Sequence, residues 1–274
     1  MRIFVTGASG FIGSAVVPEL IAGGHEVVGL ARSDASAAAL TAAGAQVRRG
    51  DLLDPDSLRA GAQDADAVVH LAFIHDFSKF EENQRTDRQA IDLFGDVLEG
   101  SDRPLVIASG LVGLDTGKPG VEDGPMTRWA TAAATVRLAE RGVRSVVLGL
   151  PTTVHGEGDH GFIHSVGLVG REKGVSGYID DGAHTWPAVH RLDAASLFRL
   201  AVEKAPAGTV LHALAEPAIP TREIAEAIGR KLDVPTASIP RDAAAAHFGW
   251  VAPFWGMSVT GDSGPTRELL GLSL

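Results

Sequence analysis

The chain has 274 residues, of which 45% are hydrophobic and 21% charged, enough for one large domain or for a domain with a smaller lobe attached. Its 24 Lys and Arg residues against 34 Asp and Glu residues give a net charge of −10, which argues against nucleic-acid binding. It has no cysteine, which excludes disulfides, thiolate metal sites and a cysteine nucleophile, and no apolar run long enough to cross a bilayer.

The N-terminal stretch predicts a strand, a glycine-rich turn and a helix, in that order. A short apolar run ends at Thr6, and glycines follow with the spacing G-x-x-G-x-x-G. Gly7 permits the tight turn, Gly10 lets a pyrophosphate approach backbone N–H groups, and Gly13 lets the helix pack closely against the strand. This order favours a dinucleotide-binding turn over an ordinary strand-to-helix turn. Because Arg2 leads directly into this strand, we expect no signal peptide and a cytoplasmic protein.

Short β-branched runs then alternate with amphipathic stretches as far as Leu150. The expected strands are 26–30, 46–49, 67–72, 104–108 and 145–150, and the expected helices are 34–43, one opening at 54–58, 82–98 and 127–141, with a loop at 114–125. This alternation predicts an α/β fold of the Rossmann type, with a doubly wound parallel sheet and helices on both faces. Ligands of such sheets bind outside the carboxyl ends of the strands.

Beyond Leu150 the pattern is less regular. We expect a loop at 155–161, a helix at 162–173, a short strand at 176–179, a helix at 192–204, a strand at 209–213 and a helix opening at 221. Residues 1–150 should form the dinucleotide-binding core. Residues 151–274 should form mainly a small substrate-binding lobe, interleaved with the last elements of the core.

Several short motifs occur along the chain in a fixed order. They are TGASGFIG at 6–13, GDL at 50–52, HLA at 70–72, PTTVHG at 151–156 and VHRLDAA at 189–195. They resemble, in the same order, the TGxxGxxG turn, the adenine-contacting GDL, the HLA beside the cofactor, PxxVYG and VHVDDVA of the short-chain dehydrogenase/reductase superfamily. The match is to its extended branch of NAD(P)-dependent epimerases, dehydratases and reductases, with His155 in place of the PxxVYG tyrosine.

The resemblance implies NAD(P) as the cofactor and a small molecule as the substrate. The residues that it implies in cofactor binding are Gly7, Ser9, Gly10, Phe11, Ile12, Gly13, Asp51, Leu52, Leu71, Ala72, Phe73, Pro151, Thr153 and Val154. For Asp51, the alternative is a turn residue that precedes a helix. In similar proteins the helices that correspond to 82–98 and 127–141 form a dimer face, so a homodimer is an expectation of the same kind.

The chain departs from the superfamily at its catalytic Tyr-x-x-x-Lys pair. Its one tyrosine is Tyr178, and Gly182 stands four residues later. The segment 122–134, where the motif belongs, holds neither a tyrosine nor a lysine. Arg128 is the candidate for the lysine position and so for cofactor binding, since the lysine of the superfamily holds the ribose, but a guanidinium does not titrate in the range that catalysis requires. Tyrosine-dependent catalysis is therefore not available, and the chain is an atypical member.

The residues after the second strand favour NADP over NAD. An acid at this point would bind the ribose 2′-hydroxyl, but Arg32 and Ser33 stand there and the first acid is Asp34. Arginine pairs with a 2′-phosphate and a serine hydroxyl can donate to it. The alternative is a solvated surface arginine with NAD as the cofactor.

Ser109 and His75 are the candidate catalytic residues. Ser109 matches the catalytic serine of the superfamily, at the carboxyl end of the fifth strand, where a hydroxyl can stabilise negative charge on a substrate oxygen. The alternative is a serine that caps its own turn. His75 follows the fourth strand, and its imidazole could replace the lost tyrosine as proton donor; an ordinary loop histidine is an equal alternative.

His155 and Trp186 are the further candidates for substrate contact. His155 should lie near the mouth of the site, and Trp186 offers an aromatic wall, with core packing as the equal alternative. His160 and His164 follow His155, but their spacing leaves a metal site without a third anchor, so we expect loop histidines and no metal.

These observations predict an NADP-dependent oxidoreductase that acts on a small carbonyl or hydroxyl compound. Ser109 would polarise the oxygen, and His75 or an ordered water would handle the proton. Two alternatives remain: a redox sensor that binds NADP without turnover, and an epimerase or dehydratase that recycles its hydride. We expect no nucleic-acid partner and no membrane attachment.

Overall fold

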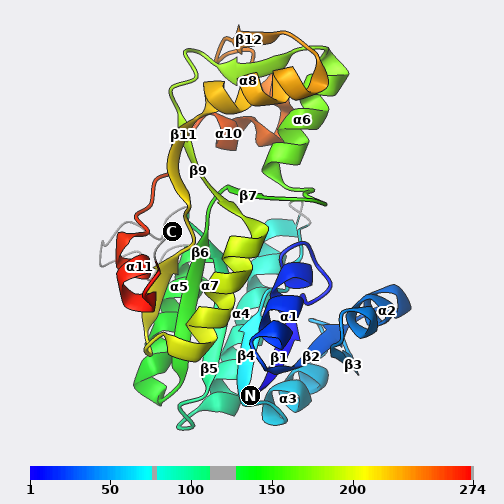
Figure 1. Cartoon of the computed structure of the whole chain (residues 1–274), viewed down its shortest axis with the longest axis vertical. Coiled ribbons are helices and arrows are strands. Elements are labelled where there is room, and N and C mark those ends of the chain that lie inside the picture. The colour runs from blue at the N-terminus through cyan, green and yellow to red at the C-terminus, as the bar shows by residue number, and fades with distance from the viewer. Residues whose placement is uncertain (76–78, 112–127, 273–274) are drawn as a thin grey trace.

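A seven-stranded sheet forms the centre of the computed structural model, which describes residues 1–75, 79–111 and 128–272 (Figure 1). Its order is β10-β6-β5-β4-β1-β2-β3, and all its pairings are parallel. The strands are β1 (Arg2–Thr6), β2 (Glu26–Ala31), β3 (Gln46–Arg49), β4 (Ala67–His70), β5 (Pro104–Gly110), β6 (Arg144–Leu150) and β10 (Thr209–His212). The prediction of a doubly wound parallel sheet is confirmed, whereas the expected loop at 114–125 lies outside the described residues.

Helices cover both faces of this sheet. They are α1 (Gly13–Ala22), α2 (Asp34–Ala42), α3 (Pro55–Gln63), α4 (Phe80–Leu98), α5 (Arg128–Arg137), continued by a 3-10 turn (Leu138–Arg141), and α7 (Arg191–Lys204). Alternate residues of β1 show how the two layers form: Ile3 and Val5 pack with α1 and α7, and Phe4 packs with α3 and α4. Because both faces are covered, the central strands are almost continuously apolar.

The second half of the chain adds a lobe beyond the carboxyl ends of the central strands (Figure 1). Its elements are α6 (Phe162–Lys173), β8 (Ser176–Ile179), α8 (Thr221–Leu232), β12 (Thr236–Ile239), α9 (Ala244–Phe248), a 3-10 turn (Gly249–Val251) and α10 (Ala252–Trp255). Strands β8 and β12 pair in parallel. The lobe has its own apolar core, with Trp186 and Trp255 completely buried in it.

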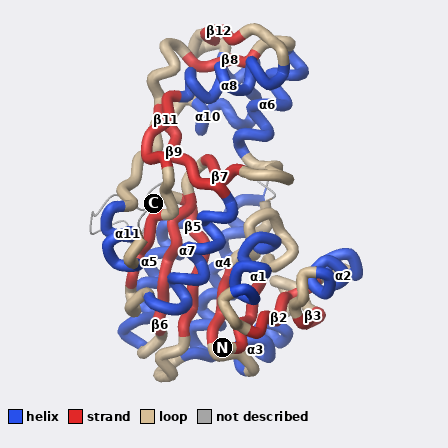
Figure 2. The backbone as a smooth tube through the Cα atoms, viewed as in Figure 1, coloured by secondary structure: helices blue, strands red, loops and turns tan. Residues whose placement is uncertain are grey.

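A small three-stranded sheet connects the lobe with the central sheet (Figure 2). It consists of β7 (Thr153–His155), β9 (Thr185–His190) and β11 (Glu216–Pro220), and the last helix, α11 (Gly264–Leu270), lies beside β10. Residues beyond 150 thus supply α7 and β10 to the central layers, so a division of the chain at residue 150 stays a proposal.

Several boundaries and strands differ from the expectations. Strand β4 ends at His70 rather than Ala72, and His155 belongs to β7 rather than to a loop. Strands β9, β11 and β12 were not predicted. Strands β9 and β11 contain Pro187 and Pro217. Proline is typical of strand edges rather than strand interiors, so the residue pattern did not predict either strand.

The helices within the described ranges include none that is long and apolar enough to cross a membrane.

Candidate active site

The glycine turn between β1 and α1 is compressed in the way that a dinucleotide site requires. Gly7 has φ +65°, and a Cβ atom on it would lie 2.6 Å from the backbone nitrogen of Ala72. A Cβ atom on Gly13 would lie 2.2 Å from the carbonyl oxygen of Gly7. Side chains at these two positions would therefore collide with backbone atoms, which cannot move without disrupting the turn.

The same turn presents free amide groups. Gly10 donates to the carbonyl of Gly7 at 3.0 Å and Ser14 donates to Gly10 at 2.8 Å. Among the described residues, no backbone hydrogen bond uses the amides of Phe11, Ile12 or Gly13. These amides lie at the N-terminal end of α1, where the helix dipole favours an anion. The turn therefore fits the pyrophosphate of a dinucleotide, with Ser9 and Gly10 exposed beside it.

A buried hydrogen-bond chain holds β4 against this turn. Thr6 Oγ1 accepts from the amide of Ala72 at 3.3 Å and lies 2.7 Å from His70 Nδ1, while His70 Nε2 lies 3.2 Å from Asp87 Oδ1. Because the Asp87 carboxylate can only accept, His70 Nε2 donates to it, and in the neutral imidazole Nδ1 then accepts from the Thr6 hydroxyl. These hydrogen bonds fix the start of the segment 71–73, which the sequence motif predicts to lie beside the cofactor.

At the end of β2, the structure brings together the residues expected at the adenosine end. The Arg32 side chain is 78% exposed, and its Nε lies 3.9 Å from Asp51 Oδ2. Asp34, the nearest acid in sequence, is paired with Arg49. The Ser33 hydroxyl caps α2 by accepting from the amide of Ser36 at 3.1 Å. Arg32 is thus available to an anion, and Ser33 has a structural role of its own.

Ser109 lies near the carboxyl end of β5, beside Gly149 of β6, and is 3% exposed. Its hydroxyl has no hydrogen-bond partner among the described residues. The same holds for Thr131 in α5 and for Thr152 and Thr153, which follow β6. Buried polar groups are nearly always paired, so unpaired hydroxyls at neighbouring strand ends indicate a place where a ligand supplies the partners. Thr131 and Thr152 were not predicted, because the motifs give no signal for them.

The other predicted residues have varied surroundings. His75 is exposed and its ring meets the edge of Phe73 at 5.2 Å between centroids. His155 is half-buried and its ring centroid lies 5.3 Å from that of His190. Among the described residues, no hydrogen bond joins His75 or His155 to Ser109. Pro151 is buried, whereas Leu52, Leu71 and Val154 are half-buried at the edges of the main core; Arg128 begins α5, but its side chain is outside the described part.

Trp186 does not offer an exposed aromatic wall to the substrate; of its two alternatives, the structure favours core packing. It is 0% exposed, packs edge-on against Trp255 at 4.8 Å, and donates its indole N–H towards the carbonyls of Phe254 and Met257. Packing in the lobe core thus explains it completely. Aromatic surface is offered instead by Trp250, which is 51% exposed and packs against Phe162 and Phe254 at 5.6 and 6.4 Å.

An arginine that the sequence analysis did not single out reaches the glycine turn. The guanidinium carbon of Arg191 lies 5.5 Å from the centroid of the Phe11 ring, and its Nη1 lies 3.4 Å from Ser14 Oγ. His160 meets the edge of the same Phe11 ring at 5.7 Å. The signal in the sequence was the second valine of VHVDDVA, which this chain replaces with Arg191.

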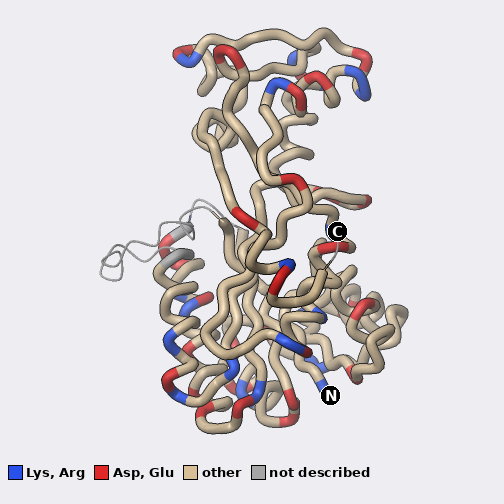
Figure 3. The backbone as a smooth tube through the Cα atoms, turned by 60° about the vertical axis from the view of Figure 1, so that its left-hand side comes forward, with Lys and Arg blue, Asp and Glu red and all other residues tan. Residues whose placement is uncertain are grey.

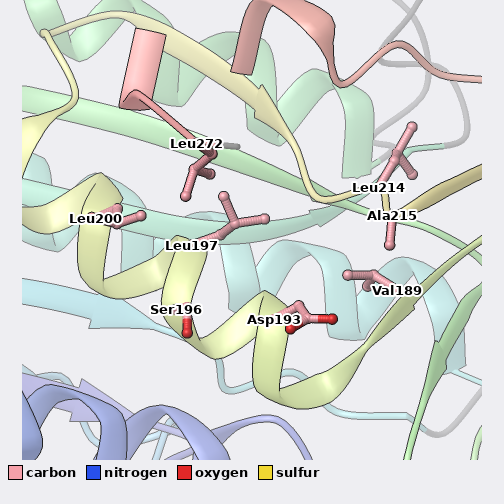
Figure 4. A pocket seen from close by; sticks show the side chains of 8 residues that line it. All are labelled: Val189, Asp193, Ser196, Leu197, Leu200, Leu214, Ala215 and Leu272. Carbon is pink, nitrogen blue, oxygen red and sulfur yellow. The ribbon is translucent and has the colours of Figure 1, made fainter. Parts of the chain in front are cut away.

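A pocket of about 230 Å³ lies beside α7 (Figure 4). It is lined by Val189, Asp193, Ser196, Leu197, Leu200, Leu214, Ala215 and Leu272. None of the predicted site residues contributes to it, so this pocket is separate from the glycine turn. The described part of the chain also holds no group of three or more His, Asp or Glu side chains arranged to bind a metal.

Comparisons with known proteins show which family and which proteins this chain is similar to. The family model of the NAD dependent epimerase/dehydratase family matches residues 3–101. An uncharacterized protein of Schizosaccharomyces pombe is 46% identical over 277 residues, covering 99% of this chain and 94% of its own length. One of Saccharomyces cerevisiae is 43% identical over 279 residues, with the same coverage.

Solved structures share the fold at low identity. The dTDP-glucose 4,6-dehydratase DesIV from Streptomyces venezuelae, determined with NAD bound, matches with a TM-score of 0.72 and 21% identity. The match covers 100% of this chain and 92% of that chain.

Proposed function

Because the chain belongs to the NAD dependent epimerase/dehydratase family, within the short-chain dehydrogenase/reductase superfamily, we propose that it is an NADPH-dependent oxidoreductase that reduces a small carbonyl compound or catalyses the reverse reaction. The observation that carries this proposal is the buried hydroxyl of Ser109, which has no partner among the described residues and lies at the carboxyl edge of the sheet. Bound NADPH would supply the hydride.

Ser109 would donate its hydroxyl proton in a hydrogen bond to the substrate oxygen. A donor held in place before the reaction stabilises the charge that develops on that oxygen, and removing one such donor typically costs 10²–10³ in rate. Because the chain lacks the usual tyrosine, the proton would come from His75 or from a water. The exposure of His75 leaves it open to exchange with solvent protons.

NADP is favoured over NAD by the geometry at the end of β2. Among the described residues, the ion pair of Arg32 is the long one with Asp51, at 3.9 Å, and Asp34 pairs with Arg49 instead. A 2′-phosphate offers the anion that an exposed guanidinium binds well. Because Asp34 pairs with Arg49, its carboxylate is not free to accept a hydrogen bond from the ribose 2′-hydroxyl of NAD.

The lobe favours a substrate with an apolar part. Trp250, Phe162 and Phe254 form an aromatic group, and Figure 1 places α10 and the start of α6 on the side of the lobe nearest the central sheet. Large aromatic surfaces bind planar or apolar ligands. We therefore expect apolar aldehydes and ketones to be better substrates than charged sugars.

The test is NADPH oxidation with a panel of aliphatic and aromatic carbonyl compounds, for the wild type and Ser109→Ala. The proposal predicts turnover by the wild type and a kcat about 10²–10³ lower for Ser109→Ala, with an unchanged Kd for NADPH. Binding without turnover across the panel would instead favour the NADP sensor. A cofactor that stays bound through gel filtration and is not consumed would favour the recycling epimerase or dehydratase.

A further inference from the structure

We propose that Arg191 is a cofactor-binding residue that holds the pyrophosphate of the dinucleotide together with the amides of the glycine turn. This inference rests on the proposed function, because it requires that a dinucleotide binds there. It assigns a role to a residue that stands where the superfamily motif VHVDDVA has a valine.

The fold brings Arg191 to the pyrophosphate end of the site. Helices α1 and α7 pack side by side on one face of the sheet, and both begin at the carboxyl edge (Figure 1). Arg191 is the first residue of α7, which is capped by His190, whose Nδ1 accepts from the amide of Leu192 at 3.3 Å. Its guanidinium therefore lies beside the first turn of α1, 3.4 Å from Ser14 Oγ.

The surrounding residues hold the stem of this side chain in one path. A Cβ atom on Gly156 would lie 3.0 Å from Cγ and 3.1 Å from Cδ of Arg191, so a side chain at position 156 would crowd the stem. Gly156 also has φ +147°, which disfavours other residues. At the far end, the Phe11 ring receives the guanidinium on its face at 5.5 Å. Arg191 is half-buried and directed at the residue whose amide begins the anion site.

The charge of Arg191 has no anionic partner among the described residues. Arg199, two turns further along α7, makes ion pairs with Glu19 and Glu203 at 2.8 and 3.0 Å. Besides the Phe11 ring, the polar contact of its guanidinium within the described ranges is the long one with the neutral Ser14 hydroxyl. A partly desolvated guanidinium is stabilised chiefly by an anion, and its forked donors match phosphate oxygens.

The pyrophosphate is the anion best placed to contact Arg191. The amides of Phe11, Ile12 and Gly13 are unpaired at the same end of α1, so a phosphate there would face both the helix and the guanidinium. Figure 3 shows few basic residues along the connections between the lobe and the sheet. Arg32, at the end of β2, serves the other phosphate, which only NADP carries.

The experiment is calorimetric titration of NADPH and NADH into the wild type, Arg191→Met, Arg191→Lys and Arg222→Met. Methionine keeps the apolar stem, and Arg222, on the lobe surface beside Glu226, is the matched control. Since both cofactors carry the pyrophosphate, Arg191→Met should weaken both by the same factor, roughly tenfold or more. Arg191→Lys should recover part of the loss, and Arg222→Met should bind as the wild type does.

Thermal unfolding without cofactor shows whether each variant is folded. Equal affinities of Arg191→Met and the wild type would overturn the inference and leave the proposed function intact. A loss confined to NADPH would also overturn it, because it would assign Arg191 to the 2′-phosphate. A wild type that binds neither cofactor would overturn the proposed function and this inference together.

Discussion

Two buried polar side chains at the carboxyl edge of the sheet are used in opposite ways. His70 has partners for both ring nitrogens, Thr6 and Asp87, and so fixes the backbone that follows β4. Ser109 is equally buried, yet its hydroxyl is unpaired among the described residues. An unpaired buried hydroxyl costs about 1–3 kcal/mol of stability. Such a cost is expected where the partner arrives with the ligand, which is the role that we propose for Ser109.

In the lobe, we expect His247 to make stability depend on pH. Burial, with a smaller effect from Lys173, lowers the pKa of His247 below its usual value of 6.5. Its Nε2 is buried and has no partner in the described structure. The unfolded chain therefore binds a proton at a higher pH than the folded chain does. The contribution of His247 to the free energy of unfolding should be constant well above pH 6.5 and should fall as the pH drops through 6.5 towards the folded-state pKa.

Urea denaturation at a series of pH values between 5 and 8 measures this effect. His247→Gln, which carries no titrating group, should lose less stability on acidification than the wild type. His164→Gln, an exposed position on α6, is the matched control and should follow the wild type. An equally steep pH dependence in His247→Gln and the wild type would show that His247 does not carry the effect.

At the scale of elements, we expect the turn from β1 to α1 to determine both helix packing and cofactor binding. Gly13→Ala would place a Cβ atom 2.2 Å from the carbonyl of Gly7 and 2.7 Å from that of Ala8. Since both are backbone atoms, we expect a loss of about 1–3 kcal/mol in the free energy of unfolding. NADPH binding should weaken at least tenfold, because the displaced turn no longer aligns its amides.

The matched control is Gly167→Ala in α6. No atom lies within 4 Å of a Cβ atom added there, so this change should raise stability by about 0.5–1 kcal/mol and leave NADPH binding unchanged. Denaturation and calorimetry of both variants test the pair. Wild-type stability and affinity in Gly13→Ala would contradict the packing argument.

The central elements could be predicted from the sequence because their signals are local. β1 and β6 contain the apolar runs 3–5 and 146–148, and α4 was placed within two residues of its start. The connecting sheet could not be predicted in the same way. β7 has three residues, β11 pairs with a register irregularity, and β9 and β11 contain prolines, so these strands depend on long-range pairing rather than on pattern.

At the scale of the whole molecule, the same distinction holds for the candidate site. The glycine turn and Arg32 were found from the sequence because motif and strand order reveal them. The approach of Arg191 to Phe11 joins segments that are 180 residues apart, and no spacing rule predicts it. The burial of Trp186 likewise follows from how the lobe packs, since a sequence does not distinguish a core tryptophan from one at a site.

The arrangement of the whole chain gives one central claim. We propose that the turn at 7–13 binds the dinucleotide and directs its nicotinamide towards Ser109, below a lobe that supplies apolar surface. Every role assigned to Arg32, Arg191 and Ser109 depends on this orientation of the cofactor.

A crystal structure of the protein soaked with NADPH tests this claim most directly. The account predicts density for the pyrophosphate over the amides of Phe11 and Ile12, the 2′-phosphate at Arg32 and the nicotinamide ring beside Ser109. A dinucleotide bound away from the glycine turn, or bound with its adenine beside Ser109, would contradict the account.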